Sequence, residues 1–236
     1  MKHTRICAAV LAVVLCLSMG ILSAAAQDSE PTAENQELTT YKGVSIGGKL
    51  QGSDPNGLEL CYEITTQPVK GRVELQDDGS FVYTPNEGKK GRDYFGFTVT
   101  NSDGITSQEA TVIIRIQKQK TSVTYSDMHG SGSEYAAVLL AETGIYTGAC
   151  TGGNYLFEPE AEVSRADFLA MCMELGDTKL LSSVLTTGFS DDESIPVWAK
   201  PYVSTALLQG YISGYSEDGR AVFHAQNGVT LAEASV

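Results

Sequence analysis

Two short stretches of the chain each have a hydroxyl residue followed, three positions later, by an acidic residue. Ser164 stands three residues before Asp167, and Thr230 stands three residues before Glu233. A hydroxyl residue followed by an acid at this spacing is typical of a helix N-terminus, where each side chain accepts a backbone N–H of the first turn. The free N–H groups of a helix start also attract anions, and Arg165 is placed to pair with a carboxylate. The pattern therefore predicts two helix starts and leaves two roles open for Arg165, a ligand contact or a surface salt bridge.

The segment that carries these residues has helical periodicity and repeats itself. Apolar residues recur at a spacing near 3.6 after residue 125, as the pattern of Phe168, Leu169 and Cys172 shows. Residues 125–127 (YSD) match 189–191 (FSD), and residues 144–148 (GIYTG) match 210–214 (GYISG). These matches predict two helix-loop-helix units, at 125–180 and 187–236. The second unit is incomplete because the sequence stops within its last predicted helix, which indicates either a truncated sequence or a missing further unit beyond Val236.

The segment 41–118 has a different pattern, in which short alternating runs are separated by turn residues every eight to twelve positions. The runs RVEL (72–75) and SFVYT (80–84) flank Asp78-Gly79, whose glycine supplies the positive φ of a tight hairpin. The last run, 110–116, places Val112, Ile114 and Ile116 on one face. These features predict an all-β sandwich, followed by a polar linker at 119–124.

The N-terminal residues indicate export. Lys2 and Arg5 precede an uncharged apolar run over 6–22, and small residues follow at 23–26, which is typical of a signal peptide cleaved after Ala26. The next residues, 27–40, are polar, acidic and without aromatics, so we expect a flexible leader there. Without a second segment of membrane-spanning length, we expect a secreted protein with no membrane partner after cleavage.

Composition excludes several classes of partner. The chain is 42% hydrophobic and 19% charged, which suits folded domains, and its formal net charge is −13. Removing residues 1–26 takes away two cations and no acid, so the mature charge is −15. A surface of that sign repels nucleic acid, and no Lys/Arg stripe offsets it.

Residues that could hold a metal, pair as a disulfide or catalyse a reaction are sparse. Cys61, Cys150 and Cys172 fit no zinc pattern, and Cys150 with Cys172 either pair or remain free thiols. We expect no cofactor, with calcium at Asp54, Asp93 and Asp103 as the alternative if these aspartates converge at one end of the sandwich. Adjacent acids, such as those at 191–193, are interpreted as solvated turns. Because no nucleophile, base and orienting residue fall into a catalytic pattern, we expect a protein that is not an enzyme.

The β segment resembles the bacterial cadherin-like and Ig-like modules of secreted and cell-surface proteins. The resemblance rests on the turns and strands GKL (48–50), DPNGL (54–58), DGSFVYTP (78–85) and GRDYF (91–95). It implies a spacer or adhesive domain.

The repeats resemble S-layer homology (SLH) units. Such a unit opens with aromatic-Ser/Thr-Asp, continues through a Trp-Ala helix and a Gly-Ile-x-x-Gly loop, and closes on a Thr-Arg-Ala-Glu helix start. The corresponding residues here are YSD (125–127), GIYTG (144–148) and SRAD (164–167) in the first unit, and FSD (189–191), WA (198–199), GYISG (210–214) and TLAE (230–233) in the second. With the β segment, this implies a multidomain protein: an all-β Ig-like or cadherin-like sandwich followed by all-α SLH repeats.

The SLH resemblance implies a binding site for wall polysaccharide, often through a pyruvylated sugar. Carried onto this chain, the ligand-binding residues are Ser164, Arg165, Trp198 and Thr230, with Trp198 serving either as a wall for a sugar ring or as a core residue. Neither unit has the full set, since Gly132 replaces the expected tryptophan of the first and Leu231 the expected arginine of the second.

The leading hypothesis is a non-enzymatic protein of the cell surface, attached through its SLH repeats to cell-wall polysaccharide within a surface-layer assembly. The alternative is a protein–protein interaction or assembly module whose degenerate repeats no longer bind glycan.

Overall fold

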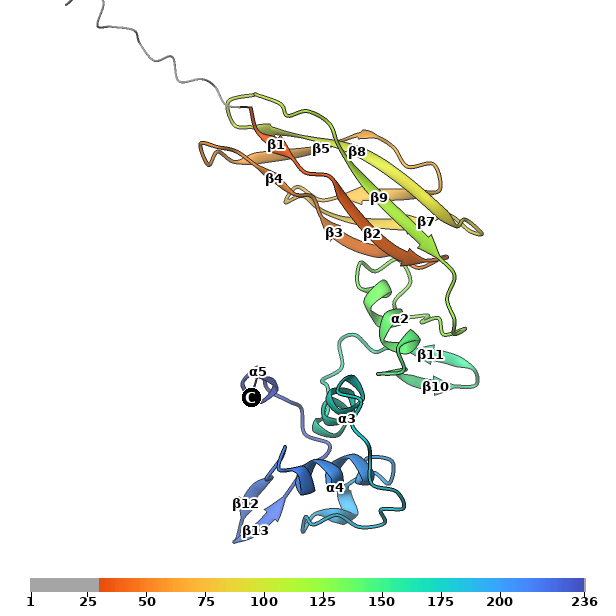
Figure 1. Cartoon of the computed structure of the whole chain (residues 1–236), viewed down its shortest axis with the longest axis vertical. Helices are drawn as coiled ribbons and strands as arrows, with labels where there is room; N and C mark the ends of the chain where they lie inside the picture. The colour runs from red at the N-terminus through yellow and green to blue at the C-terminus, as the bar shows by residue number, and fades with distance from the viewer. Residues whose placement is uncertain (1–29, 236) are drawn as a thin grey trace, which may run out of the picture.

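The computed structural model describes residues 30–235, so the signal peptide predicted at 1–26 lies outside the described residues. A β-sandwich comes first, and the helical segments follow it along the longest axis of the molecule (Figure 1). Within 30–235, no helix is long and apolar enough to cross a bilayer.

The sandwich predicted over 41–118 consists of two sheets. Strand β2 runs parallel to β9, with Leu38 beside Ile114, and the other pairs within these sheets are antiparallel. The larger sheet has the order β2 (Gln36–Tyr41), β9 (Ala110–Gln117), β8 (Gly91–Asn101), β5 (Leu60–Thr66); the smaller has β3 (Ile46–Lys49), β7 (Ser80–Pro85), β6 (Gly71–Leu75); a separate pair joins β1 (Thr32–Ala33) and β4 (Gly52–Ser53).

One aromatic and β-branched core lies between the two sheets. Val112, Ile114 and Ile116 of β9 face inward as predicted, and Phe81 of β7 meets Phe95 of β8 edge to face, with 5.3 Å between ring centroids. Burying one such side chain stabilises the fold by about 1.5–3 kcal/mol. The predicted turn is also confirmed, since Gly79 has φ +82°.

The prediction of a flexible leader at 27–40 is wrong from residue 32 onward, because β1 and most of β2 lie there. Leu38 packs against the sandwich core, and the fully buried Thr40 donates its hydroxyl to the Val44 carbonyl at 2.7 Å. Pairing with β9 satisfies the backbone groups of a segment whose side chains are mostly polar. Composition alone therefore concealed a strand whose stability comes from its partner.

The second half contains two units of the same build, each with a helix, a hairpin and a second helix. The first unit has α2 (Glu134–Glu142), β10 (Ala149–Thr151), β11 (Asn154–Leu156) and α3 (Arg165–Leu175). The second has the 3₁₀ turn η1 (Asp192–Ser194), α4 (Lys200–Gln209), β12 (Tyr215–Glu217), β13 (Arg220–Val222) and α5 (Leu231–Ala234).

The prediction of an all-α second half is wrong at these hairpins. Gly152-Gly153 and Asp218-Gly219 all have positive φ, which is the backbone conformation that a tight two-residue turn needs. Each strand has only three residues, too few for alternation to be recognised beside a helical period.

Equivalent hydrogen bonds show that the two units are structural repeats. Asp127 accepts the backbone N–H groups of Phe157 and Glu158, at 3.0 and 2.7 Å. The equivalent Asp191 accepts those of Phe223 and His224, at 2.9 and 2.8 Å. In both units the aspartate ties the opening of the unit to the segment after its hairpin.

The first unit is bonded directly to the sandwich. Gly47 of β3 donates its N–H to the Gly132 carbonyl at 2.8 Å. A Cβ at Gly47 would lie 3.0 Å from that oxygen, so the two backbones meet where a side chain would not fit. Glu134, which is 5% exposed, accepts the N–H groups of Ser45 at 3.0 Å and Gly130 at 3.1 Å.

The sandwich and the linker also complete the core of the first unit. Val44 and Val123 pack in one buried cluster with Tyr125 and Val138. The Glu142 carboxylate accepts the backbone N–H groups of Lys120 and Thr121 in the linker, both at 2.7 Å. The linker 119–124 contains no helix or strand. These contacts nevertheless fix it against the first unit.

Candidate functional site

Both predicted helix starts are formed. Helix α3 begins after Ser164, whose hydroxyl accepts the Asp167 N–H at 3.1 Å. Helix α5 begins after Thr230 and has the reciprocal arrangement, because the Glu233 carboxylate also accepts the Thr230 N–H at 2.9 Å. The first-turn N–H groups addressed by these bonds are satisfied within the chain.

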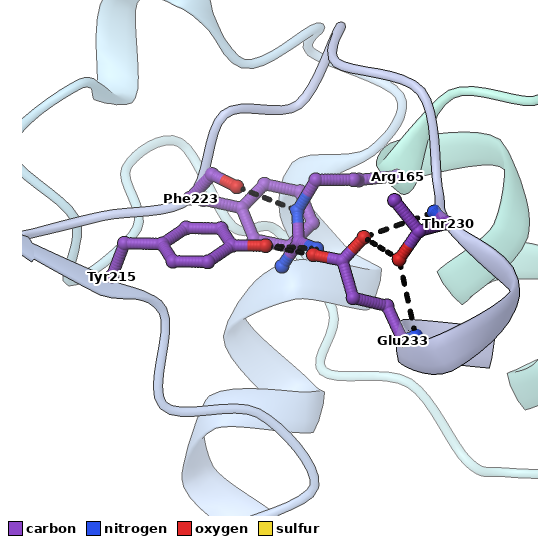
Figure 2. Close-up of polar contacts among 5 residues, drawn as sticks. All are labelled: Arg165, Tyr215, Phe223, Thr230 and Glu233. Atoms are coloured by element: carbon purple, nitrogen blue, oxygen red, sulfur yellow. Dashed lines mark hydrogen bonds and ion pairs between the residues drawn. The ribbon is translucent and has the colours of Figure 1, made fainter. Parts of the chain in front are cut away.

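Arg165 joins the two units (Figure 2). Its Nε donates to the Phe223 carbonyl at 3.0 Å, and its Nη1 donates to the Tyr215 hydroxyl and the Glu233 carboxylate, both at 2.9 Å. The guanidinium also lies 4.7 Å from the centroid of the Tyr215 ring. With only 15% of its side chain exposed, Arg165 is mostly buried, and its ion pair with Glu233 is a contact between the two units and not a surface salt bridge.

The charges of this cluster stabilise one another. The hydroxyl of Tyr215 donates to Glu233, and this bond, followed by those from Thr230 and the charge of Arg165, lowers the pKa of Glu233 to about 2. The same bond raises the pKa of the Tyr215 phenol. At neutral pH the cluster therefore contains an ionised glutamate, a cationic arginine and a neutral tyrosine.

A groove of about 740 Å³ opens beside Arg165, where α3 faces the loop that leads into β12. Tyr211, 64% exposed, contributes one wall, and Ser213, Thr178 and Glu233 add polar groups. An apolar wall with a few polar groups is the usual composition of a ligand site. The main apolar and aromatic residues of the groove are Phe168, Leu169, Met173, Tyr211, Ile212 and Tyr215.

The structure does not bring Trp198 to this groove. Its side chain is 49% exposed and stands against Tyr202, with 6.3 Å between ring centroids, so it is not a core residue either. Leu231, which occupies the position of the expected second arginine, is 87% exposed. Of the four predicted ligand-binding residues, Ser164 and Thr230 cap helices, Arg165 lines the groove and Trp198 lies outside it.

Three aspartates of the repeat units have specific partners, and two of them, Asp191 and Asp192, belong to the acidic run 191–193 that was expected to be solvated. Asp127 and Asp191 accept backbone N–H groups, as described above, and these bonds lower the pKa of each carboxyl. Asp192 accepts from the Lys200 ammonium at 2.7 Å, and this bond, with one from the Thr187 backbone, lowers its pKa to about 2. Only the repeated aromatic-Ser-Asp pattern could have singled out Asp127 and Asp191.

The aspartates proposed for calcium do not converge. Asp93 is 3% exposed and accepts the Val69 and Lys70 N–H groups and the Tyr83 hydroxyl. Asp54 is bonded instead to Asn101, at the other end of β8. No group of three or more metal-ligating side chains occurs within residues 30–235, and Cys61, Cys150 and Cys172 are all free and exposed.

Comparison with known families confirms the predicted cadherin-like sandwich in the N-terminal half. Residues 24–118 match the family model of the bacterial cadherin-like domain. The match begins upstream of the predicted segment 41–118, in agreement with β1 and β2 belonging to the sandwich. No curated protein matches the chain.

Solved structures similar to this chain each cover about two fifths of it. A putative α-galactosidase from Bacteroides fragilis is 14% identical, covering 38% of this chain and 18% of its own (TM-score 0.30). A SusE-like surface-located polysaccharide-binding protein from Bacteroides thetaiotaomicron is 19% identical, covering 40% of this chain and 16% of its own (TM-score 0.30). The PKD domain of the KIAA 1837 protein is 16% identical and covers 42% of this chain and 96% of its own (TM-score 0.29). The aligned segment is thus less than a fifth of the two larger proteins.

Proposed function

We propose that this chain is a non-enzymatic, exported cell-surface protein whose C-terminal repeats bind cell-wall polysaccharide. The sandwich serves as a spacer or adhesive domain carried on those repeats. The observation that carries the proposal is the groove beside Arg165, which combines exposed aromatic side chains with a fixed polar cluster. The resemblance of the repeats to SLH units supports the same conclusion.

The groove has the groups that a sugar residue needs. The exposed ring of Tyr211 suits the C–H side of a pyranose, while Ser213 and Glu233 offer hydrogen-bonding atoms to its hydroxyls. Arg165 uses Nε and Nη1 internally, and its Nη2 has no partner within residues 30–235. Those donors suit the carboxylate of a pyruvylated wall polymer.

Co-sedimentation of the full chain with purified wall material tests this proposal. We expect binding to native wall and loss of binding after the pyruvyl groups are removed. Tyr211→Ala should abolish binding, because it removes an exposed wall of the groove. Tyr94→Ala is the matched control, since Tyr94 is similarly exposed (56%) but lies on the sandwich. A chain that remains in the supernatant with both wall preparations contradicts the proposal.

The alternative function is a protein–protein interaction or assembly module. Two exposed leucines favour it, Leu231 at 87% and Leu175 at 75%, together with the internal ion pair that already occupies Arg165. This function predicts concentration-dependent self-association or capture of a surface protein, in the absence of any wall binding.

A further inference from the structure

A second hollow adjoins the groove at the Arg165 cluster, beside the hairpin β12–β13. Its volume is about 450 Å³, within the usual range of small-molecule sites. Arg165, Tyr215 and Glu233 line both spaces, so this cluster is a wall that the groove and the hollow share (Figure 2). The other side of this hairpin hollow is formed mainly by Ser216, Glu217, His224 and Asn227.

Two polar side chains of the hairpin hollow are not used by the fold. The Ser216 hydroxyl and the Asn227 amide are exposed, and neither has a hydrogen-bond partner within residues 30–235. Together they offer donors and acceptors to the hydroxyl groups of a sugar. The exposed Glu217 carboxylate, which is hydrogen-bonded to the His224 ring at 2.9 Å, would repel a second carboxylate there. The sugar residue that fits the hollow is therefore a neutral one.

The first unit shows that a repeat folds without the Asn227 amide. Its loop after the hairpin follows the same path, because the Ala161 N–H donates to the Glu158 carbonyl at 2.9 Å, as the Asn227 N–H donates to the His224 carbonyl at 3.1 Å. Glu158 and His224 also share a positive φ, +57° and +59°. The first unit thus has alanine where the second has Asn227, on the same backbone. The backbone of the loop therefore does not account for the amide of Asn227.

We propose that the groove and the hairpin hollow together bind two consecutive sugar residues of the wall polymer. The first lies in the groove with its carboxylate at Arg165, and the second, a neutral residue, lies in the hollow with a hydrogen bond to Asn227. A polymer that passes the Arg165 cluster enters the hollow, because the two spaces share that wall. This inference rests on the proposed function and adds that the chain recognises a disaccharide instead of a single sugar.

Calorimetric titration of the full chain with size-fractionated fragments of native wall polymer, containing one, two or three sugar residues, tests the proposal. We expect the two-residue fragment to bind roughly tenfold more tightly than the one-residue fragment, and the third residue to add little. Asn227→Ala should weaken binding of the two-residue fragment roughly three- to tenfold, the value of one hydrogen bond, and leave that of the one-residue fragment unchanged. Gln226→Ala is the matched control, since Gln226 is an exposed neighbour that lines neither space.

Equal affinity of the wild-type chain for the one-residue and two-residue fragments overturns the proposal. So does an Asn227→Ala variant that binds the two-residue fragment as tightly as the wild type. The thermal midpoint of this variant should stay near that of the wild type, as Ala161 indicates; should it unfold, Ser216→Ala takes its place with the same expected loss. A chain that co-sediments with native wall but binds none of the fragments refutes the two-residue site and leaves the proposed function standing. A chain that does neither refutes the proposed function itself.

Discussion

Arg165 illustrates how a residue that suits ligand binding also holds the fold together. The sequence places Arg165 just inside a helix start. Whether it contacts a ligand or forms a salt bridge depends on which groups the fold brings next to its guanidinium. Its partners, Tyr215, Phe223 and Glu233, lie 50 to 68 residues further along the chain. No local pattern pairs residues at such separations. The position of Arg165 at a helix start could therefore be predicted from the sequence, but its ion pair with Glu233 could not.

Replacing Arg165 by alanine should destabilise the second unit. The change removes three hydrogen bonds and leaves the Glu233 carboxylate without its cation, which we expect to cost about 1–3 kcal/mol of unfolding free energy. The chain has one tryptophan, Trp198 in the second unit, so urea unfolding followed by its fluorescence reports on this region. An unchanged urea midpoint would contradict the structural role, and Arg220→Ala, in the exposed strand β13, is the matched control.

Because of the carboxylates Glu233 and Asp192, the second unit should become less stable as the pH falls into the acid range. The pKa values of Glu233 and Asp192 are lowered to about 2 in the folded chain, compared with ordinary values near 4. A lowered folded pKa contributes stability above the unfolded pKa, and this contribution is lost as the pH falls from about 4.5 toward 2.

The same fluorescence measurement, repeated between pH 7 and pH 2, checks this dependence. We expect the midpoint to be flat above about pH 5 and to fall below it. The Glu233→Gln variant should have a lower urea midpoint than the wild type at neutral pH. Its midpoint should also fall less than that of the wild type on acidification. A wild-type midpoint that does not change with acid would show that these pairs contribute nothing to folding.

At the scale of elements, the contact between Gly132 and β3 accounts for the glycine at this position of the first unit. The resemblance to SLH units places a tryptophan there, but the Gly132 carbonyl accepts the Gly47 N–H, and a Cβ on Gly132 would lie 3.3 Å from Gly47 Cα. The position that would carry an aromatic ring is instead packed flat against β3. The first unit is therefore adapted to hold the sandwich.

Gly132→Trp should consequently open the junction between the sandwich and the first unit, although tryptophan is the residue that the resemblance to SLH units places there. We expect trypsin to cleave the linker at Lys118 or Lys120 much faster than in the wild type, because the linker loses its anchoring to a displaced α2. Ser133→Trp, an exposed neighbour with no capping bond, should leave the cleavage rate unchanged. Equal rates for Gly132→Trp and the wild type would refute a rigid junction.

The elements that could be predicted are those whose signal is local. Alternation in 110–116, the Asp78-Gly79 turn and the Ser164 and Thr230 caps all lie within a few residues, and all are formed. Strand β2 and the hairpins β10–β11 and β12–β13 were missed. The strand depends on a parallel partner more than 70 residues away, and the hairpins are too short to show a period.

At the scale of the whole molecule, charge distinguishes two modes of wall binding. The chain has a net charge of −13, so its long-range field repels an anionic polymer. Binding through the groove must then come from short-range contacts. Raising the salt concentration to about 0.5 M should leave co-sedimentation unchanged or increase it, because salt screens the repulsion. Binding that disappears with salt would indicate nonspecific charge attraction instead.

The sequence predicted Trp198 as the aromatic residue that contacts the glycan, whereas the structure places Tyr211 in the groove. Tyr211 lines the groove beside Arg165, whereas Trp198 lies outside it against Tyr202. The most direct test compares co-sedimentation of the full-length Tyr211→Ala and Trp198→Ala variants with native wall material. We predict loss of wall binding for Tyr211→Ala and normal binding for Trp198→Ala. Normal binding for Tyr211→Ala with loss for Trp198→Ala would contradict the groove as the glycan site.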